Sequence, residues 1–365
     1  MLAETLLVGT TRTAADGLEP EGPAIAQYNL HTGAALVSVR RSQTAVHGLA
    51  YTPAHVLAQQ SDRSIINVYS ARGLTLETTV PFPEAFTALA ASPCGHYVAG
   101  GTQSGRVYLW QLAGGRVAAS AAAHVQRVTA LAFSGAATHV VAGSADATVS
   151  VWSAAQLLDT RAAGTRRGPE RVLNRHAGEV TAVAVGRAAA GGPSELLVSA
   201  ARDGRVVASE LHSGRLLRTF VLAGGGVPLC LALDPAERAV YVGLEGGGIA
   251  PIELLGPAAP EAPDVPVVVD TAAEAWREPG PSSDDGGACA VLALGVSYEG
   301  NMLVCGNARG EVSVWDVATG ALFRTLCQLG GVYIPVLRVL VLLVTDEWSR
   351  VVECAAGWLT SPQRP

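Results

Sequence analysis

Short stretches of alternating apolar and small or polar residues recur along the whole chain, each after a tight turn. Strict alternation is the pattern of a β-strand with one buried face. Seven of these stretches carry a comparable position, and the gaps between those positions are 41, 41, 42, 57, 43 and 63 residues: Tyr28, Tyr69, Trp110, Trp152, Ser209, Ile252 and Trp315. The pattern therefore predicts a repeat protein built from strands.

The length of the repeat indicates the architecture. Units of about forty residues with four strand-like segments each are typical of β-propeller blades of the WD-repeat type. We expect an all-β fold, a seven-bladed WD-repeat β-propeller over residues 1–355 with a short tail at 356–365. The two longest gaps predict insertions at about 155–175 and 256–288. Such a ring usually serves as a platform for partners.

The fourth unit carries the most complete polar pattern. Its strand-like segments RVTALAF, THVVAGS and ATVSVWS each alternate, and four residues among and around them resemble the structural tetrad of WD repeats: His124, Ser144, Asp146 and Trp152. In that tetrad a buried hydrogen-bond chain joins a turn to the neighbouring strand. Loss of one member would leave buried partners unpaired at about 1–3 kcal/mol each, so we interpret the four residues as architecture and not as a catalytic site.

Other units keep only part of this pattern. The departures are Ser209 at the tryptophan position of the fifth unit, Ser104 at the aspartate position of the third and Arg309 in the tight turn of the seventh. We therefore expect sheet packing between blades to supply most of the stability.

The first unit offers three strands, which leaves one strand to be found for ring closure. The apolar run VYIPVLRVLVLLV at 332–344 is the candidate, and we predict that it pairs beside the N-terminal strands. A membrane span is the competing interpretation. The run has about half the length that a span needs and contains Pro335 and Arg338, which argues against it.

Composition agrees with a soluble intracellular protein that can bury a large core. Hydrophobic residues make up 49% of the 365 positions, and the formal net charge is −6. No basic leader precedes the first apolar run, so no secretory signal is expected. The six cysteines have no paired spacing, which favours a reducing compartment. Neither they nor the eight histidines form a CxxC or HxxxH pair, so no metal site and no cofactor is expected.

All 25 basic residues are arginine. A phosphate-binding loop that needs GK[ST] and Schiff-base catalysis by lysine are therefore excluded. The glycine triplets at 224–226 and 246–248 fall where turns are expected and lack a strand-to-helix context. No nucleophile with a partnered base can be named from spacing, so no enzymatic activity is expected.

The first insertion is basic. It holds Arg161, Arg166, Arg167, Arg171 and Arg175 against Asp159 and Glu170. Guanidinium groups on such a segment suit phosphates or carboxylates, which makes these arginines candidates for a partner or RNA contact. A solvated loop is the equally simple alternative. The negative net charge argues against nucleic-acid binding over the whole surface, so any RNA contact would be local.

The second insertion is acidic and rich in Pro and Ala. It carries Glu261, Asp264, Asp270, Glu274, Glu278, Asp284 and Asp285 against the single Arg277. Low hydrophobicity and excess charge predict that most of it is a solvated linker. The apolar island VPVVVDTAAEAW within it is expected to order as a strand or a turn of helix against the ring or a partner.

Several stretches together resemble one family: IAQYNLHTGAAL, SIINVYS, PFPEAFTALAASPCGHYVAGGTQSGRVYLWQLAGGRV, AHVQRVTALAFS, VVAGSADATVSVWSAAQLLD and PLCLALDPAERAVYVGLEGG. They are similar to the WD-repeat subunit of the pre-ribosome complex that acts in rRNA internal-spacer processing. The resemblance covers roughly residues 4–330. It implies a non-enzymatic scaffold of the nucleolus and nucleoplasm that assembles with a helical-repeat subunit and a second partner subunit, and joins a midasin-type AAA ATPase on the pre-large-subunit particle.

Some members of that family are also tied to replication licensing on chromatin. Members usually continue into a helical or coiled-coil tail that can dimerise, whereas this sequence ends at Pro365, which leaves two alternatives: a chain without that tail, or a truncated gene model. The alternative class is another propeller adaptor, such as a ubiquitin-ligase substrate receptor or a vesicle-coat scaffold, because unrelated functions share the ring.

Overall fold

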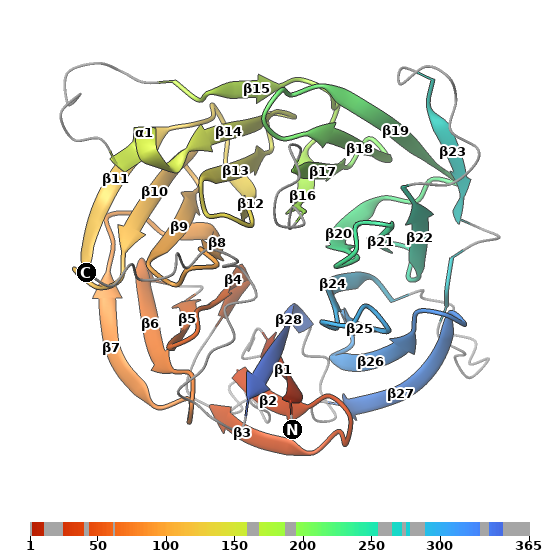
Figure 1. The fold of residues 1–365 in the computed structure, drawn as a ribbon, viewed down its shortest axis with the longest axis horizontal. Coiled ribbons are helices and arrows are strands. Elements are labelled where there is room, and N and C mark those ends of the chain that lie inside the picture. Colours follow the sequence, from red (N-terminus) through yellow and green to blue (C-terminus); the bar gives the residue numbers. More distant parts are fainter. Residues whose placement is uncertain are drawn as a thin grey trace, which may run out of the picture.

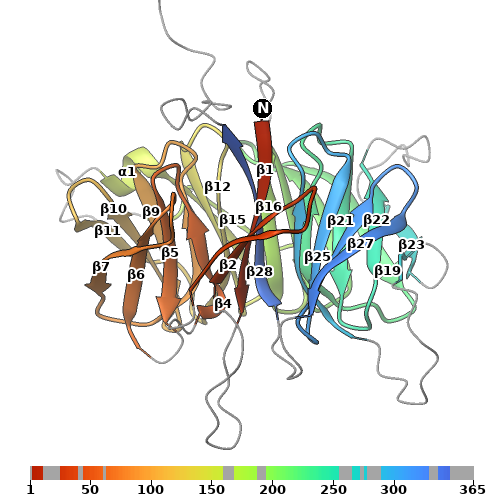
Figure 2. The ribbon, with the colours of Figure 1, turned by 90° about the horizontal axis from the view of Figure 1, so that it is seen from below.

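Seven sheets stand radially about one axis in the computed structural model (Figure 1). The structure describes residues 2–10, 25–39, 44–60, 63–158, 168–186, 195–254, 265–271, 275–277, 289–328 and 336–345. Seen from the side, the sheets form a disc whose strands run between two faces (Figure 2). The predicted seven-bladed, all-β propeller is confirmed.

Each blade is an antiparallel sheet, numbered here by its place along the chain. Blade 1 contains β28 (Val336–Thr345), β1 (Leu2–Thr10), β2 (Ile25–Asn29) and β3 (Ala35–Val39). Blade 2 contains β4 (Thr44–Tyr51), β5 (His55–Gln60), β6 (Ile65–Ser70) and β7 (Leu76–Pro81). Blade 3 contains β8 (Phe86–Ala91), β9 (Tyr97–Thr102), β10 (Arg106–Gln111) and β11 (Arg116–Ala122). Blade 4 contains β12 (Val128–Phe133), β13 (His139–Ser144), β14 (Val149–Ser153) and β15 (Arg171–Leu173), with helix α1 (Ala154–Leu158) after β14.

The remaining blades follow the same order from the axis outward. Blade 5 contains β16 (Val180–Val185), β17 (Leu196–Ala201), β18 (Arg205–Glu210) and β19 (Leu216–Ala223), to which β23 (Val267–Asp270) adds a fifth strand. Blade 6 contains β20 (Pro228–Leu233), β21 (Ala239–Leu244) and β22 (Ile249–Glu253). Blade 7 contains β24 (Val291–Val296), β25 (Met302–Asn307), β26 (Glu311–Asp316) and β27 (Ala321–Gln328).

The two ends of the described chain close the ring within blade 1. β28 pairs antiparallel with β1 in a register that runs from Leu2 opposite Thr345 to Thr10 opposite Val336. The predicted closure is confirmed, and the strand lies at 336–345, slightly later than the predicted 332–344. Within the described ranges α1 has five residues, and no membrane-spanning helix is found.

The core lies between blades and not within them. One cluster joins Trp152 and Val140 of blade 4 to Leu109 and Ala99 of blade 3, and the other junctions are filled in the same way. Hydroxyl groups add a second link at two junctions, where Thr87 bridges blades 3 and 4 and Thr129 bridges blades 4 and 5. Thr129 Oγ1 on β12 donates to the carbonyl oxygens of both Gly143 and Val180, which belong to blades 4 and 5.

At three junctions, close packing between blades depends on a glycine on the second strand. A Cβ placed on Gly143 of β13 would lie 2.7 Å from Cγ1 of Val180 on the first strand of blade 5. Gly101 and Gly243 hold the same relation to Val128 and Val291, with distances of 2.4 and 2.5 Å. These glycines are needed for the approach of the next blade, since their backbone conformation is ordinary for a strand.

Blade 6 has three strands among the described residues, and Pro251 explains why its outer edge carries no regular fourth strand. Ile249 exchanges both backbone hydrogen bonds with Trp276, at 2.9 and 2.8 Å, so its polar groups face outward from the sheet. Pro251 is two residues further along β22 and therefore also faces outward. It has no N–H to donate to a fourth strand.

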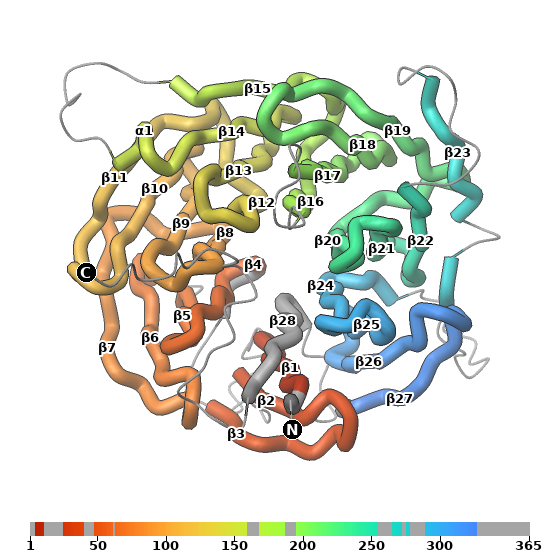
Figure 3. The backbone as a smooth tube through the Cα atoms, viewed as in Figure 1, coloured from red at the N-terminus to blue at the C-terminus, as the bar shows by residue number. Residues whose placement is uncertain are grey.

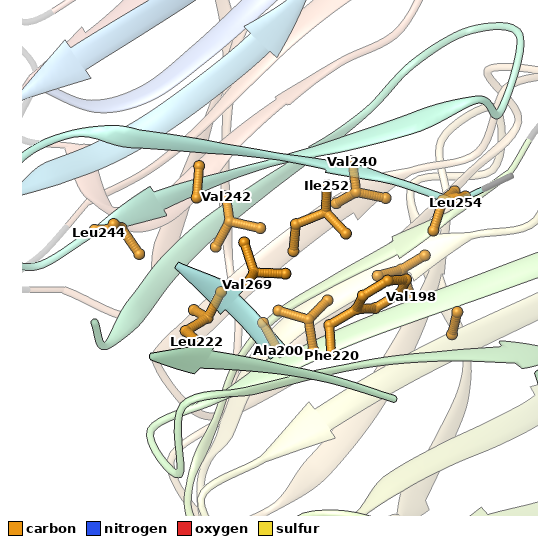
Figure 4. Packing of buried hydrophobic residues seen from close by; sticks show 13 residues of the cluster. Val198, Ala200, Phe220, Leu222, Val240, Val242, Leu244, Ile252, Leu254 and Val269 are labelled. Carbon is orange, nitrogen blue, oxygen red and sulfur yellow. The ribbon is translucent and has the colours of Figure 1, made fainter. Parts of the chain in front are cut away.

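The acidic insertion crosses to blade 5 instead. β23 pairs in parallel with β19, with Phe220 opposite Val267 and Ala223 opposite Asp270, and lies outside it (Figure 3). The prediction that the apolar island orders as a strand against the ring is therefore confirmed. Val269 fills the junction of blades 5 and 6, among Leu222, Val242 and Ile252 (Figure 4).

Candidate interaction surface

A continuous hydrogen-bond chain runs through blade 4 and supports the turns at its rim. The indole Nε1 of Trp152 donates to Ser150 Oγ at 2.9 Å, and that oxygen lies 2.8 Å from Nε2 of His124. His124 Nδ1 lies 3.1 Å from Oδ2 of Asp146. Because Ser150 accepts from the indole, its own proton is donated to Nε2, which assigns the ring proton to Nδ1 and points it at Asp146.

Ser150 stands in this chain where Ser144 was predicted, so that assignment was wrong. Ser144 is fully buried at the end of β13, where its Oγ donates to the carbonyl of Arg127 at 2.9 Å and accepts from the N–H of Asp146 at 3.2 Å. Its role is to fix the turn. The signal that identifies Ser150 was available, since residues two apart on a strand share a face and Ser precedes Trp by two both here and at Ser313–Trp315.

Burial and hydrogen bonding set the protonation states of His124 and Asp146 in this hydrogen-bond chain. Burial lowers the pKa of His124 below its ordinary value although Asp146 favours the charged ring. The Asp146 carboxyl is also partly buried, which acts to raise its pKa, but hydrogen bonds from Thr148 and the nearby ring bring the pKa below its usual range. At neutral pH, His124 is therefore a neutral imidazole that is hydrogen-bonded to the carboxylate of Asp146.

Three members of this hydrogen-bond chain are arranged like the catalytic triad of a hydrolase. Their burial argues against a catalytic role. The Ser150 hydroxyl is within hydrogen-bond distance of His124, and His124 is within hydrogen-bond distance of Asp146. In a hydrolase these three positions would be the nucleophile, the base and the carboxylate. The His124 side chain is 1% exposed and Ser150 is fully buried beneath the indole. No substrate atom can approach this hydroxyl, so the cluster holds the blade together.

Blade 5 builds a similar chain from a different strand. His176 Nε2 lies 2.8 Å from Oγ of Ser199, and its Nδ1 lies 3.6 Å from Asp203. Val207 occupies the place that Ser150 has in blade 4, and Ser199 is its direct cross-strand neighbour on β17. The hydroxyl therefore lies on the neighbouring strand in blade 5, and Nδ1 of His176 stays near Asp203 without forming a hydrogen bond. Burial lowers the pKa of His176 as well.

Blade 3 has Phe82 at the histidine position, with its ring 5.5 Å from that of Trp110, and carries a carboxylate, Glu84, two residues later at the rim. Glu84 accepts hydrogen bonds from Ser104 and, at 3.3 Å, from the hydroxyl of Tyr108. The bond from Ser104 is the main reason that the pKa of Glu84 lies below its usual range. The indole nitrogen of Trp110 in this blade is buried without a hydrogen-bond partner. Sequence reasoning noted Ser104 and did not find Glu84.

The five arginines predicted as a partner contact do not form one described patch. Arg161, Arg166 and Arg167 lie outside the described residues. Arg171 is part of β15, the fourth strand of blade 4, and its Nε donates to the carbonyl of His212 in blade 5 at 2.5 Å. Arg175 is exposed two residues beyond the end of β15, next to His176. Within the described residues, Arg171 therefore serves the junction of two blades.

Trp276, the last residue of the apolar island, anchors the acidic insertion to the ring a second time. Its ring lies 6.3 Å from that of Trp315 at an interplanar angle of 23°, and 5.7 Å from that of Tyr241. Gly320 leaves room for it, since a Cβ there would lie 2.6 Å from the indole nitrogen. The described residues contain no group of three or more side chains suited to a metal ion.

The fold and the chain of blade 4 define a WD-repeat propeller, and residues 116–153 match the family described as WD domain, G-beta repeat. The sequence is 27% identical to the pre-rRNA-processing protein crb3/ipi3 of Schizosaccharomyces pombe, across 86% of this chain and 74% of that protein. It is 28% identical to pre-rRNA-processing protein IPI3 of Yarrowia lipolytica, across 89% and 73%. It is 30% identical to WD repeat-containing protein 18 of Bos taurus, across 84% and 67%. The chain belongs to this family of IPI3 and WD repeat-containing protein 18, which confirms the resemblance seen in the sequence.

Proposed function

We propose that the chain is a scaffold subunit of a complex that processes the internal spacer of pre-rRNA during maturation of the large ribosomal subunit. The observation that carries this proposal is the extent of the similarity. Two relatives whose names state pre-rRNA processing match 86% and 89% of the chain. The aligned part of the sequence includes blades whose buried polar residues differ from the common WD repeat. Similarity over those blades is more than a shared propeller fold requires.

A non-catalytic role is supported by the placement of the polar groups. The Ser–His–Asp arrangement of blade 4 is closed to solvent. The absence of lysine excludes a phosphate-binding loop of the GK[ST] type and Schiff-base catalysis by lysine. The rim turns and outer strands are then the surfaces on which the ring acts. Its proposed partners are a helical-repeat subunit, a second subunit of the same complex and a midasin-type AAA ATPase, all in the nucleolus and nucleoplasm.

Affinity purification of the full chain tests this function. We expect the tagged protein to recover large-subunit assembly proteins and rRNA that still contains the internal spacer. Recovery of cullin components or coat subunits, without spacer-containing rRNA, would instead identify a ubiquitin-ligase receptor or a coat scaffold. Purification at low and high salt separates electrostatic partners from those held by apolar contact.

The basic insertion supplies the first prediction for this function. Reversal of Arg166 and Arg167 to Glu is expected to reduce pre-ribosome association about tenfold, because phosphate and carboxylate groups would then be repelled. The matched control is Arg116→Glu with Arg215→Glu, two exposed arginines on other strands and turns. Sucrose-gradient co-sedimentation measures the result. Unchanged association of the Arg166/Arg167 variant would show that this segment is a solvated loop.

A further inference from the structure

Four arginine side chains gather where blades 4 and 5 meet on one face of the disc. Arg127 comes just before β12, Arg175 lies between β15 and β16, and Arg202 and Arg205 lie at the turn between β17 and β18. The segment before β16 is bonded to that turn, since the N–H of Arg202 donates to the carbonyl of Glu179 at 2.8 Å. Successive strands are antiparallel, so this turn and the connections between blades lie on the same face. The four arginines therefore form one arginine rim.

Carboxylates hold two of these guanidinium groups in place without covering them. Oε1 of Glu179 lies 2.6 Å from Nη2 of Arg127, and its Oε2 lies 3.5 Å from Nε of Arg202. The two arginine side chains remain 48% and 51% exposed, so they still offer donors to solvent. Asp203 is only 10% exposed and accepts the backbone N–H of Ala177. The rim therefore presents guanidinium groups outward, while its carboxylates are mostly covered.

The other two arginines have no such partner. Neither Arg175 nor Arg205 pairs with a carboxylate within the described ranges, and both are exposed. Burial is the main cause of the low pKa of His176, and the positive charge of Arg205 lowers that pKa further, which places this guanidinium near the ring. Arg175 directly precedes the same histidine. The corresponding turn of blade 6 has Glu245 and three glycines instead, so the positive charge is particular to the seam of blades 4 and 5.

Val125 adds an apolar point to the arginine rim. Its side chain is 92% exposed, two residues before Arg127. Its backbone N–H donates to Oδ2 of Asp146 at 3.2 Å, so the hydrogen-bond chain of blade 4 holds this residue in position. A valine fixed outward in this way offers a contact to another apolar side chain. The described turns of the rim expose no aromatic ring on which a base could stack, since the side chains of His124 and His176 are buried.

We propose that the arginine rim, together with Val125, binds an extended, acidic segment of a partner protein that carries an apolar residue among its carboxylates. Arg175 and Arg205 supply unpaired donors for these carboxylates. The other two arginines are already held in place, which lowers the entropy cost of a further contact. RNA leaves the exposed valine uncovered, and its bases have no ring to stack on there. The inference rests on the scaffold role proposed above and names the chemistry of one partner.

Peptide binding to the purified full chain tests the arginine rim. The probe is a capped, fluorescent peptide of about ten residues, which reaches at most about 35 Å, with Glu at most positions and Leu at the centre. One control peptide has Gln in place of Glu, and another keeps Glu and has Ser in place of Leu. Fluorescence anisotropy is expected to show at least about tenfold weaker binding of the Gln peptide, about threefold weaker binding of the Ser peptide and a loss of affinity as salt rises. Equal binding of the Glu and Gln peptides would overturn the proposal.

Charge reversal locates the site. Arg175→Glu combined with Arg205→Glu is expected to weaken probe binding at least about tenfold, because both unpaired donors are replaced by repelling carboxylates. The matched control is Arg116→Glu with Arg215→Glu, at exposed positions next to turns between third and fourth strands, on the opposite face. Both variants should melt within about 2 °C of the wild type, since no described ion pair is removed. Equal losses of binding in the two variants would contradict the assignment to this rim.

The valine is tested with both acidic peptides. Val125→Ser is expected to weaken binding of the Leu-containing probe about threefold and to leave binding of the Ser peptide unchanged, because only the probe offers an apolar partner. Val268→Ser is the matched control, at a 67% exposed position of β23, and should change neither. An equal effect of Val125→Ser on the two peptides would contradict the apolar contact.

Two other occupants of the rim would also overturn the proposal. If RNA occupies it, a single strand of about ten nucleotides binds more tightly than the probe and loses affinity in the Arg175/Arg205 variant. If a second copy of the chain occupies it, sedimentation shows a dimer that the same variant abolishes. Recovery of spacer-containing rRNA by the wild-type chain is scored separately. Its absence contradicts the proposed function alone, whereas absent peptide binding with normal rRNA recovery contradicts the arginine rim alone.

Discussion

Individual hydroxyl groups show how the blades tolerate substitution. In blade 4 the hydroxyl that meets the histidine belongs to Ser150 on the third strand, and in blade 5 it belongs to Ser199 on the second. Both place an oxygen 2.8 Å from Nε2 of the ring. What is retained is the hydrogen bond in space and not the residue at one position of the repeat. In both blades Nε2 is the imidazole nitrogen that keeps a hydroxyl partner, because a buried polar atom without one destabilises the fold.

Ser150→Ala is expected to lower the free energy of unfolding by about 2–4 kcal/mol, because it leaves both the Trp152 indole N–H and Nε2 of His124 buried without a partner. Denaturant unfolding measures the change. Ser120→Ala, at an exposed position of β11, is the control and should change stability by no more than about 0.5 kcal/mol. In a Trp152→Phe background the cost of Ser150→Ala should be smaller, and equal costs in both backgrounds would rule out the coupling.

The buried histidines predict a loss of stability in mild acid. The pKa values of His124 and His176 lie below about 6.5, so the unfolded chain binds protons there before the folded chain does. Stability should fall as pH decreases below that value, by about 1.4 kcal/mol per pH unit for each group. His124→Asn or His176→Asn should reduce this slope, whereas His96→Asn, at an exposed turn, should not. Unfolding curves between pH 5 and 7.5 decide, and an unchanged slope in both core variants would contradict the neutral-ring assignment.

At the scale of elements, the contact between the second strand of one blade and the first strand of the next limits how closely the blades pack. Gly143→Ala is expected to destabilise the fold by about 1–3 kcal/mol, because the new methyl group meets Val180. Val180→Ala should recover part of that loss when the two changes are combined. Gly114→Ala is the control, since its Cβ would lie 3.5 Å from the nearest atom. Thermal unfolding of the set would refute the packing limit if the two glycine variants behaved alike.

Alternation predicted the strands because it reflects burial of one face, which is a local property. The polar chain of blade 4 was predicted only in part. Ser144 and Ser150 flank the same turn, and strand register decides which hydroxyl reaches the indole. The parallel pairing of β23 with β19 was beyond sequence reasoning for a similar reason. It depends on Pro251 closing the nearer edge and on a buried site for Val269 in a distant blade.

For the whole molecule, closure converts a row of sheets into a ring. Each innermost strand contacts its two neighbours, and β28 fills this place between β4 and β24. Glu4 on β1 strengthens the same junction by accepting a hydrogen bond from the N–H of Tyr298 in blade 7 at 2.8 Å. The last described strand is thus the innermost strand of the first blade, and removal of either chain end opens two interfaces at once.

A chain that ends before Val336 is therefore expected to melt at least roughly 5 °C lower than one that ends after Thr345, because it loses β28 and exposes an edge of β1. The comparison of the two truncations isolates the strand from everything that follows it. The shorter chain should also form larger species on concentration, since an open propeller presents unpaired backbone groups to its neighbours. Calorimetry and light scattering measure both effects. Equal melting temperatures would mean that the ring does not depend on pairing of its two ends.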